Sequence, residues 1–182
     1  MNFTRRDWII GSLGSAALAA IASAHEHAAR VVTGSTASEF EFFDKDTAAE
    51  VAAISAQILP SDDGPGAKEA GVIYFIDRAL KTFDSDKQDV YRKGIAEVQS
   101  TREELFPGSM SIAALTHEQQ AHLIRAIEKS EFFEQVRIHT LLGFLGNPSY
   151  GGNRDRVGWK YIGFEDRMVF EPPFGFYDAE AK

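Results

Sequence analysis

The sequence contains no cysteine among its 182 residues. This absence excludes disulfide bonds, zinc sites with cysteine ligands, iron–sulfur clusters, covalently attached c-type haem and thiol catalysis within the chain. Positive charge is scarce as well, because 19 Lys and Arg stand against 27 Asp and Glu, for a formal net charge of −8. Nucleic acid is therefore excluded as a partner, since binding a polyanion requires clustered basic side chains.

No segment alternates apolar and polar residues over the length of a strand, and no apolar run reaches the roughly 20 residues of a comfortable membrane span. Apolar residues recur instead at helical spacing, between short connections that carry Gly, Pro, Asp or Ser. The sequence predicts an all-α fold with about five helices in one compact domain, an irregular C-terminal lobe rich in glycine and aromatic residues, and an N-terminal signal segment.

Local signals predict where the helices begin. Capping boxes, in which a Ser or Thr and a polar residue three positions later bond each other's backbone, are expected at Thr47, Ser85 and Thr116. A further helix is expected over residues 67–83, and Ser130 is expected to cap the last one. The predicted packing residues of that last helix are Phe132, Phe133, Val136, Leu141, Leu142 and Leu145.

Residues 1–24 have the basic start, apolar stretch and small-residue exit of a secretory signal. Arg5 and Arg6 follow a polar residue and precede a spacer and two apolar residues, the pattern of a twin-arginine signal. The small residues at its end predict cleavage between Ala24 and His25, and an uncleaved membrane anchor is the alternative. We therefore expect the twin-arginine translocase, which carries folded proteins, to export the chain to the periplasm.

Residues 25–46 are expected to form a linker and docking segment, and residues 47–182 the helical domain. The linker ends in a cluster of aromatic residues, Phe40, Phe42 and Phe43. Three such side chains would be costly to leave in water. We expect them to dock onto the domain or onto a partner.

The segment 146–164 mixes glycine with Tyr, Trp, Asn and Arg, which predicts an irregular, rigid surface with aromatic rings directed outward. One interpretation is a tightly packed lobe without a partner. The other is a docking surface, because Tyr, Trp and Arg are the side chains that anchor interfaces; the aromatic tail 171–177 fits this as well. The candidate docking residues are Tyr150, Gly151, Gly152, Asn153, Arg154, Trp159 and Tyr161.

No set of residues is assigned as a catalytic, cofactor or metal site. His117 and His122 are five positions apart, so one helix face does not present both to a metal ion. Asp77 is a candidate acid. His139 lies in an apolar segment, which is more typical of a hydrogen-bonded core or interface residue than of a ligand. An independent periplasmic metal-binding protein or enzyme that uses His139 is the alternative hypothesis, and a free-standing envelope protein is a third.

The C-terminal segment carries its most specific pattern in Tyr150-Gly151-Gly152-Asn153, followed by Gly158-Trp159. With this pattern, the chain resembles the gluconate 2-dehydrogenase subunit 3 family, the small subunits of exported flavin-dependent dehydrogenases. The resemblance covers nearly all of the chain after the signal. Supporting features are the twin-arginine signal, Ile58-Leu59-Pro60, Gly64-Pro65-Gly66-Ala67, Ala70-Gly71-Val72, Phe75-Ile76-Asp77, Phe132-Phe133, His139-Thr140 and Ile162-Gly163.

The resemblance implies a non-catalytic accessory subunit of an oxidoreductase complex that acts on CH–OH donors. A large partner subunit would hold FAD and the sugar or sugar acid, a cytochrome c subunit with haem c would accept the electrons, and this chain would hold no cofactor. The chain would support assembly, stability and joint export of the flavoprotein. Through its complex it would lie at the periplasmic side of the cytoplasmic membrane.

Overall fold

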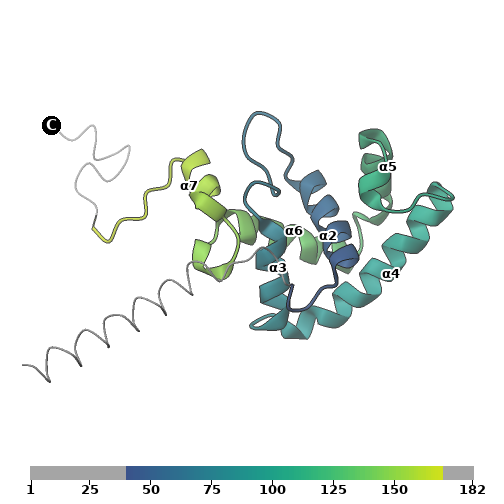
Figure 1. The fold of residues 1–182 in the computed structure, drawn as a ribbon, viewed down its shortest axis with the longest axis horizontal. Coiled ribbons are helices and arrows are strands. Elements are labelled where there is room, and N and C mark those ends of the chain that lie inside the picture. The colour runs from purple at the N-terminus through teal and green to yellow at the C-terminus, as the bar shows by residue number, and fades with distance from the viewer. Residues whose placement is uncertain (1–39, 170–182) are drawn as a thin grey trace, which may run out of the picture. The chain divides into compact units, whose positions relative to one another are not determined.

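A computed structural model describes residues 40–169, which form helices and contain no strand (Figure 1). The prediction of an all-α domain is confirmed. The predicted signal, its cleavage site, the linker up to residue 39 and the tail lie outside the described residues. The helices are α2 (Lys45–Ile58), α3 (Val72–Lys81), α4 (Gln88–Leu105), α5 (His117–Ile127), α6 (Glu131–Leu145) and α7 (Val157–Tyr161), with short turns η1 (Ser85–Lys87), η2 (Ile112–Ala114), η3 (Pro148–Tyr150) and η4 (Arg154–Arg156).

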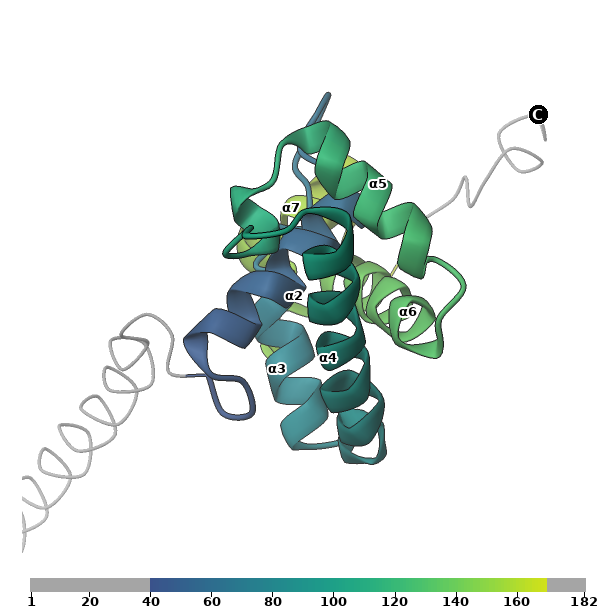
Figure 2. The ribbon, with the colours of Figure 1, turned by 90° about the vertical axis from the view of Figure 1, so that its right-hand side faces the viewer.

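None of the helices within residues 40–169 has both the length and the apolar character needed to cross a membrane. Helix α6 packs against α2, α3 and α4, and α5 packs against α2 and α4. In Figure 2, α6 lies at the right-hand edge of the bundle, below α5. One side of α6 therefore closes the core, and its other side lies at the edge of the domain. The largest fully buried side chains include Ile54, Ile76, Leu80, Tyr91, Ile112, Leu123 and His139.

Two of the predicted caps are confirmed. Thr116 Oγ1 accepts from the Gln119 amide at 3.3 Å, and Gln119 Oε1 accepts from the Thr116 amide at 2.9 Å. Ser130 Oγ accepts from the Phe133 amide at 3.1 Å and caps α6. In both places a single residue of the preferred type stands directly before the helix.

The capping box predicted at Thr47 is wrong, because the N-cap of α2 is Asp44. Its carboxylate accepts from the Thr47 amide at 2.8 Å and from the Thr47 hydroxyl at 2.9 Å. These bonds, the backbone one first, lower the pKa of Asp44. Glu50 instead accepts from the Ile112 amide and ties α2 to η2. Asp ranks among the best N-cap residues, so it takes the cap although Thr47 is also suitable.

The second and third helices are shorter than predicted. Residues 67–71 form turns, and α3 begins at Val72 after Gly71, whose φ of 62° is left-handed. Ser85 opens the short turn η1 and makes no capping bond; α4 begins only at Gln88. Gln88 caps the end of α3 instead, because its side chain donates to the Leu80 carbonyl at 2.8 Å.

The aromatic end of the linker docks onto the domain. The Asp77 carboxylate on α3 accepts three backbone amides, from Glu41, Phe42 and Phe43, at 2.7, 2.9 and 2.9 Å. Phe43 is buried, with its ring centroid 5.9 Å from that of Tyr91. Asp77, a candidate acid from the sequence, therefore has a structural role here as the acceptor that fastens the linker.

Candidate functional site: the C-terminal lobe and the adjoining apolar face

Asn153 is the centre of the C-terminal lobe, which consists of η3, η4 and α7. Its side chain is fully buried and bonds two helices at once. Nδ2 donates to the Gly146 carbonyl at the end of α6 at 2.9 Å, and Oδ1 accepts from the Gly158 amide in α7 at 2.9 Å. Its own amide donates to the Gly143 carbonyl at 2.7 Å. Asn153 therefore locks the lobe onto α6.

Backbone geometry explains the glycines of the lobe. Asn153, Asp155 and Arg156 all have positive φ, at 44°, 54° and 56°. A Cβ on Gly152 would overlap the Gly143 carbonyl, and one on Gly158 would overlap the Phe144 carbonyl. The lobe and α6 thus approach backbone to backbone, which only glycine allows at these two positions.

The exposed and buried members of the predicted docking set have different roles. Trp159 is buried, and its indole N–H donates to the Leu145 carbonyl at 2.6 Å. The expectation of outward aromatic rings is wrong for this residue, because its ring packs against Phe164 with centroids 5.0 Å apart. Tyr150 and Tyr161 are about half exposed. Asn153 and Trp159 are buried and stabilise the lobe. Only the exposed residues of the predicted docking set, such as Tyr150 and Tyr161, can contact a partner directly.

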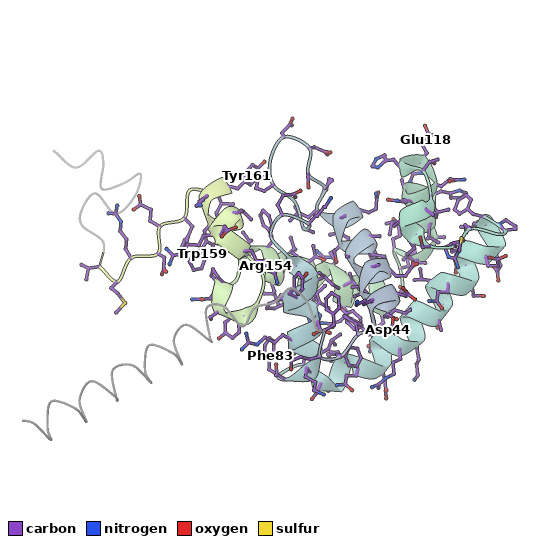
Figure 3. The ribbon with its side chains drawn as sticks, in the orientation of Figure 1. Asp44, Phe83, Glu118, Arg154, Trp159 and Tyr161 are labelled. Carbon is purple, nitrogen blue, oxygen red and sulfur yellow. The ribbon has the colours of Figure 1, made fainter. Side chains whose placement is uncertain are left out.

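The remaining members complete the attachment of the lobe to α3. The Arg154 guanidinium lies over the Tyr74 ring, 3.5 Å from its centroid, and the Arg154 amide donates to the Ala70 carbonyl at 3.0 Å. Gly151 has φ of 105° and lies over the Tyr74 carbonyl. Arg78 donates to the Ser149 carbonyl at 2.8 Å. Figure 3 shows Phe83 on the same side of the domain as Arg154 and Trp159.

Helix α6 has an apolar side that no described residue covers. Among the predicted packing residues, Phe132 and Val136 are buried and Phe133 packs against the core, so the prediction is confirmed for these three. It is wrong for Leu141, Leu142 and Leu145, which are exposed. Ile138 joins them at helical spacing, and Phe83 and Tyr150 adjoin Leu142. The six side chains, which we call the apolar face, are between 39% and 55% exposed: Phe83, Ile138, Leu141, Leu142, Leu145 and Tyr150. On a typical monomer the largest apolar patch covers about 300–600 Å² and is often functional.

A cavity of about 400 Å³ opens in the apolar face. The Phe83 and Tyr150 rings meet edge to face with centroids 5.9 Å apart, and Phe75 lies 6.1 Å from Phe83. The cavity is lined by Phe75, Phe83, Leu142, Gly146, Asn147 and Tyr150. The α6 and η3 side of the cavity is uncharged, because no Asp, Glu, Lys or Arg occurs from Ile138 to Asn153, while Arg78 and Asp84 lie at its margin beside Ser149 and Phe83. Depletion of charge around exposed aromatic rings is typical of the core of a protein interface.

A model of the family described as gluconate 2-dehydrogenase subunit 3 matches residues 45–166. The chain belongs to this family. No curated protein and no solved structure matches the chain significantly. The matched residues run from the start of α2 to just beyond α7, so the subunit 3 domain contains both the Asn153 lock and the apolar face. The family name makes the chain a subunit of a dehydrogenase complex.

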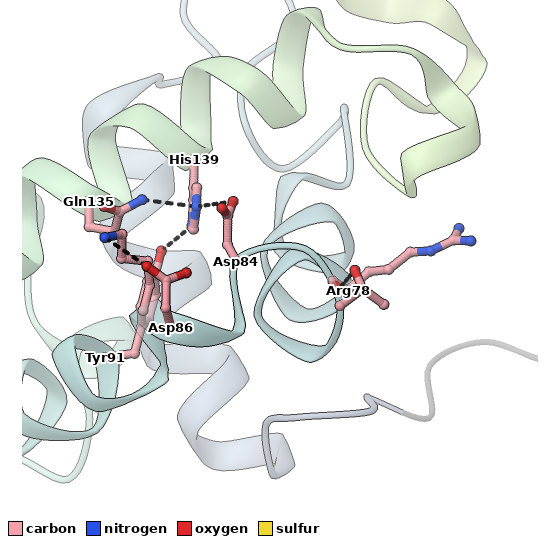
Figure 4. A network of polar contacts seen from close by, with 8 residues as sticks. Arg78, Asp84, Asp86, Tyr91, Gln135 and His139 are labelled. Atoms are coloured by element: carbon pink, nitrogen blue, oxygen red, sulfur yellow. Dashed lines mark hydrogen bonds and ion pairs between the residues drawn. The ribbon is translucent and has the colours of Figure 1, made fainter.

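The subunit 3 domain also contains a polar network around the buried His139 on α6 (Figure 4), whose ring centroid lies 6.1 Å from that of the cavity residue Phe75. Tyr91 Oη lies 2.9 Å from Nδ1, and Asp84 Oδ2 lies 3.1 Å from Nε2. Gln135 Nε2 lies 3.0 Å from the same Nε2. A neutral ring with its proton on Nε2 donates to Asp84 and accepts from Tyr91, so both ring nitrogens are engaged. In this tautomer the Gln135 amide presents its oxygen to Nε2, because two N–H groups do not bond each other.

Burial fixes the protonation states in this network. It lowers the pKa of His139, although the nearby Asp84 carboxylate acts in the opposite direction. Burial, with a smaller contribution from Asp84, raises the pKa of Tyr91 well above its usual value, so the hydroxyl keeps its proton. No group of three or more potential metal ligands occurs within residues 40–169. The contacts of His139 are those of a hydrogen-bonded core residue that joins α4, α6 and the turn after α3.

Proposed function

We propose that this chain is the non-catalytic small subunit of an exported FAD-dependent dehydrogenase of sugars or sugar acids. It binds the flavoprotein subunit and supports its assembly, stability and export. The single observation that carries the proposal is the apolar face beside the Asn153 lock. An apolar patch of this extent is costly in water, and patches of this kind mark protein–protein contacts.

The chemistry of the complex belongs to its other subunits in this proposal. The flavoprotein holds FAD and the substrate, and a cytochrome c subunit with haem c accepts the electrons. The lack of cysteine supports this division, because covalent c-type haem requires cysteine. The chain's own residues bind and position the partner.

The proposed location is the periplasm, with the complex peripheral to the cytoplasmic membrane. The signal pattern around Arg5 and Arg6 supports this location. A flavoprotein without its own signal would cross the membrane bound to this chain. Because the twin-arginine translocase carries folded proteins, FAD can be inserted before export.

The test is co-expression of this chain with its flavoprotein subunit and measurement of dye-linked dehydrogenase activity in periplasmic and cytoplasmic fractions. Changing Arg5→Lys and Arg6→Lys together should retain the activity in the cytoplasm. Arg125→Lys, an exposed residue of α5, is the matched control and should leave export unchanged. Wild-type periplasmic activity in the double variant, or in cells that lack this chain, would refute the proposal.

A further inference from the structure

We infer that the cavity between Phe83, Leu142 and Tyr150 receives one aromatic side chain of the flavoprotein subunit and is the energetic centre of that interface. The inference rests on the proposed function. It names the place of contact on this chain and the kind of side chain that fills it.

The volume of the cavity is sufficient for a large side chain. At about 400 Å³ it exceeds the roughly 30 Å³ of a water molecule many times. It also lies near the lower end of the roughly 300–1,000 Å³ of small-ligand pockets. An aromatic ring can enter such a space together with the residues that flank it, as an anchor residue does at the centre of an interface.

The lining favours an apolar aromatic occupant. Phe75, Phe83 and Tyr150 already form a chain of tilted and edge-to-face rings, and a further ring extends this arrangement. Two of the polar groups beside the cavity are engaged within the chain. The Gly146 carbonyl accepts from Asn153, and the Asn147 side chain accepts from the Ser149 amide at 3.0 Å. An occupant therefore gains little from polar atoms and much from apolar contact.

The walls are held in place before any partner binds. Leu142 stands on α6, which the Asn153 lock joins to the lobe. Tyr150 ends the turn η3, whose Ser149 carbonyl accepts from Arg78 on α3. A preformed pocket avoids the entropic cost of ordering its own side chains on binding, which raises affinity.

The occupant is the flavoprotein and not a second copy of this chain. Two copies would each bring a formal net charge of −8 to the contact, and this repulsion opposes self-association. Membership of a dehydrogenase-subunit family gives the chain another subunit to bind. The cavity is also continuous with Leu141, Leu145 and Ile138 along α6, which extends the contact beyond one side chain.

The test measures the affinity of the purified chain for the flavoprotein subunit of the same complex by isothermal titration calorimetry. Tyr150→Ala and Leu142→Asp should each weaken binding by 30-fold or more, since they remove one wall or charge the cavity. Tyr150→Phe keeps the ring and should bind within threefold of wild type. Met110→Ala removes a 91% exposed apolar side chain that lies outside the lobe and the apolar face, and should also bind within threefold.

Thermal unfolding of each variant separates loss of contact from loss of fold, and Tyr150→Phe keeps the test valid if Tyr150→Ala unfolds. Wild-type affinity in Leu142→Asp, or a loss in Tyr150→Phe equal to that in Leu142→Asp, overturns the inference and leaves the proposed function standing. No complex with the wild-type chain overturns both. A chain truncated after Val169 should show the same Leu142→Asp effect; if the effect vanishes, the chain's own tail occupies the cavity and the inference is wrong.

Discussion

Replacing Asn153 by alanine should destabilise the domain by about 3–5 kcal/mol. The buried Gly158 amide loses its acceptor, which costs about 1–3 kcal/mol, and the lost bond to the Gly146 carbonyl adds about 1 kcal/mol. Alanine at φ of 44° adds roughly 1 kcal/mol, because its Cβ disfavours the left-handed region. The side chain is fully buried, so water does not replace these bonds.

The assay is urea unfolding of the purified chain, followed by far-ultraviolet circular dichroism. Asn147→Ala is the matched control, since it removes one exposed bond in the same lobe and should cost less than about 1 kcal/mol. Asn153→Gly isolates the hydrogen bonds from the backbone strain and should be about 1 kcal/mol more stable than Asn153→Ala. Equal stabilities for Asn153→Ala and Asn147→Ala would refute the argument that Asn153 locks the lobe.

Two further predictions concern the buried polar groups. Asp77→Ala leaves three backbone amides of the linker end without their acceptor, so the free energy of unfolding should fall by about 2–4 kcal/mol. The chain before Phe43 should also become accessible to limited proteolysis. Asp89→Ala is the control and should change neither the stability nor the proteolysis. The pKa of His139 is lowered in the folded chain, so on acidification the unfolded chain binds a proton at this residue first. The free energy of unfolding should therefore fall as pH drops below about 6.5, and it should level off once the ring is protonated in the folded chain as well. His139→Gln should lack this part of the slope in urea midpoints taken from pH 7.5 to 5; parallel slopes would contradict the assignment.

The all-α class follows from the sequence because apolar spacing is a property of each segment alone. The caps at Thr116 and Ser130 were predictable for the same reason. Thr47 shows the limit of this approach. Two N-cap residues, Asp44 and Thr47, compete there, and Glu50, the expected partner of Thr47, contacts the Ile112 amide of a distant turn instead. Local patterns do not contain that contact.

The apolar face was missed because periodicity identifies apolar residues and not what covers them. Leu141, Leu142 and Leu145 have the spacing of core residues, yet Val136, His139 and Thr140 on the other side of α6 are the ones buried. One signal was present in the sequence. From Ile138 to Leu145 the helix carries no charged residue, so its apolar residues extend beyond the side that faces the core.

Trp159 illustrates the opposite error. In a glycine-rich segment its ring was expected to face outward, but the glycines let the lobe approach α6 closely enough for the indole to reach the Leu145 carbonyl. The pattern of Asn153 with Gly158-Trp159 therefore serves mainly to attach the lobe to α6. The pattern is specific because the attachment requires these residue types: Asn153 and Trp159 supply the hydrogen bonds, and glycine allows the close approach of the backbones.

Hydrogen bonds hold α6 in place both at its buried side and at its C-terminal end. On the inner side, His139 joins α6 to Tyr91 and Asp84; at its end, Asn153 and Trp159 bond the last carbonyls. A surface helix usually turns polar residues outward and apolar ones inward. Here a polar network is buried while leucines are exposed, an arrangement that holds the helix rigidly although part of its apolar surface adds nothing to the isolated domain. In the proposed complex the flavoprotein covers these leucines, so the lobe and the apolar face would act together as one docking surface.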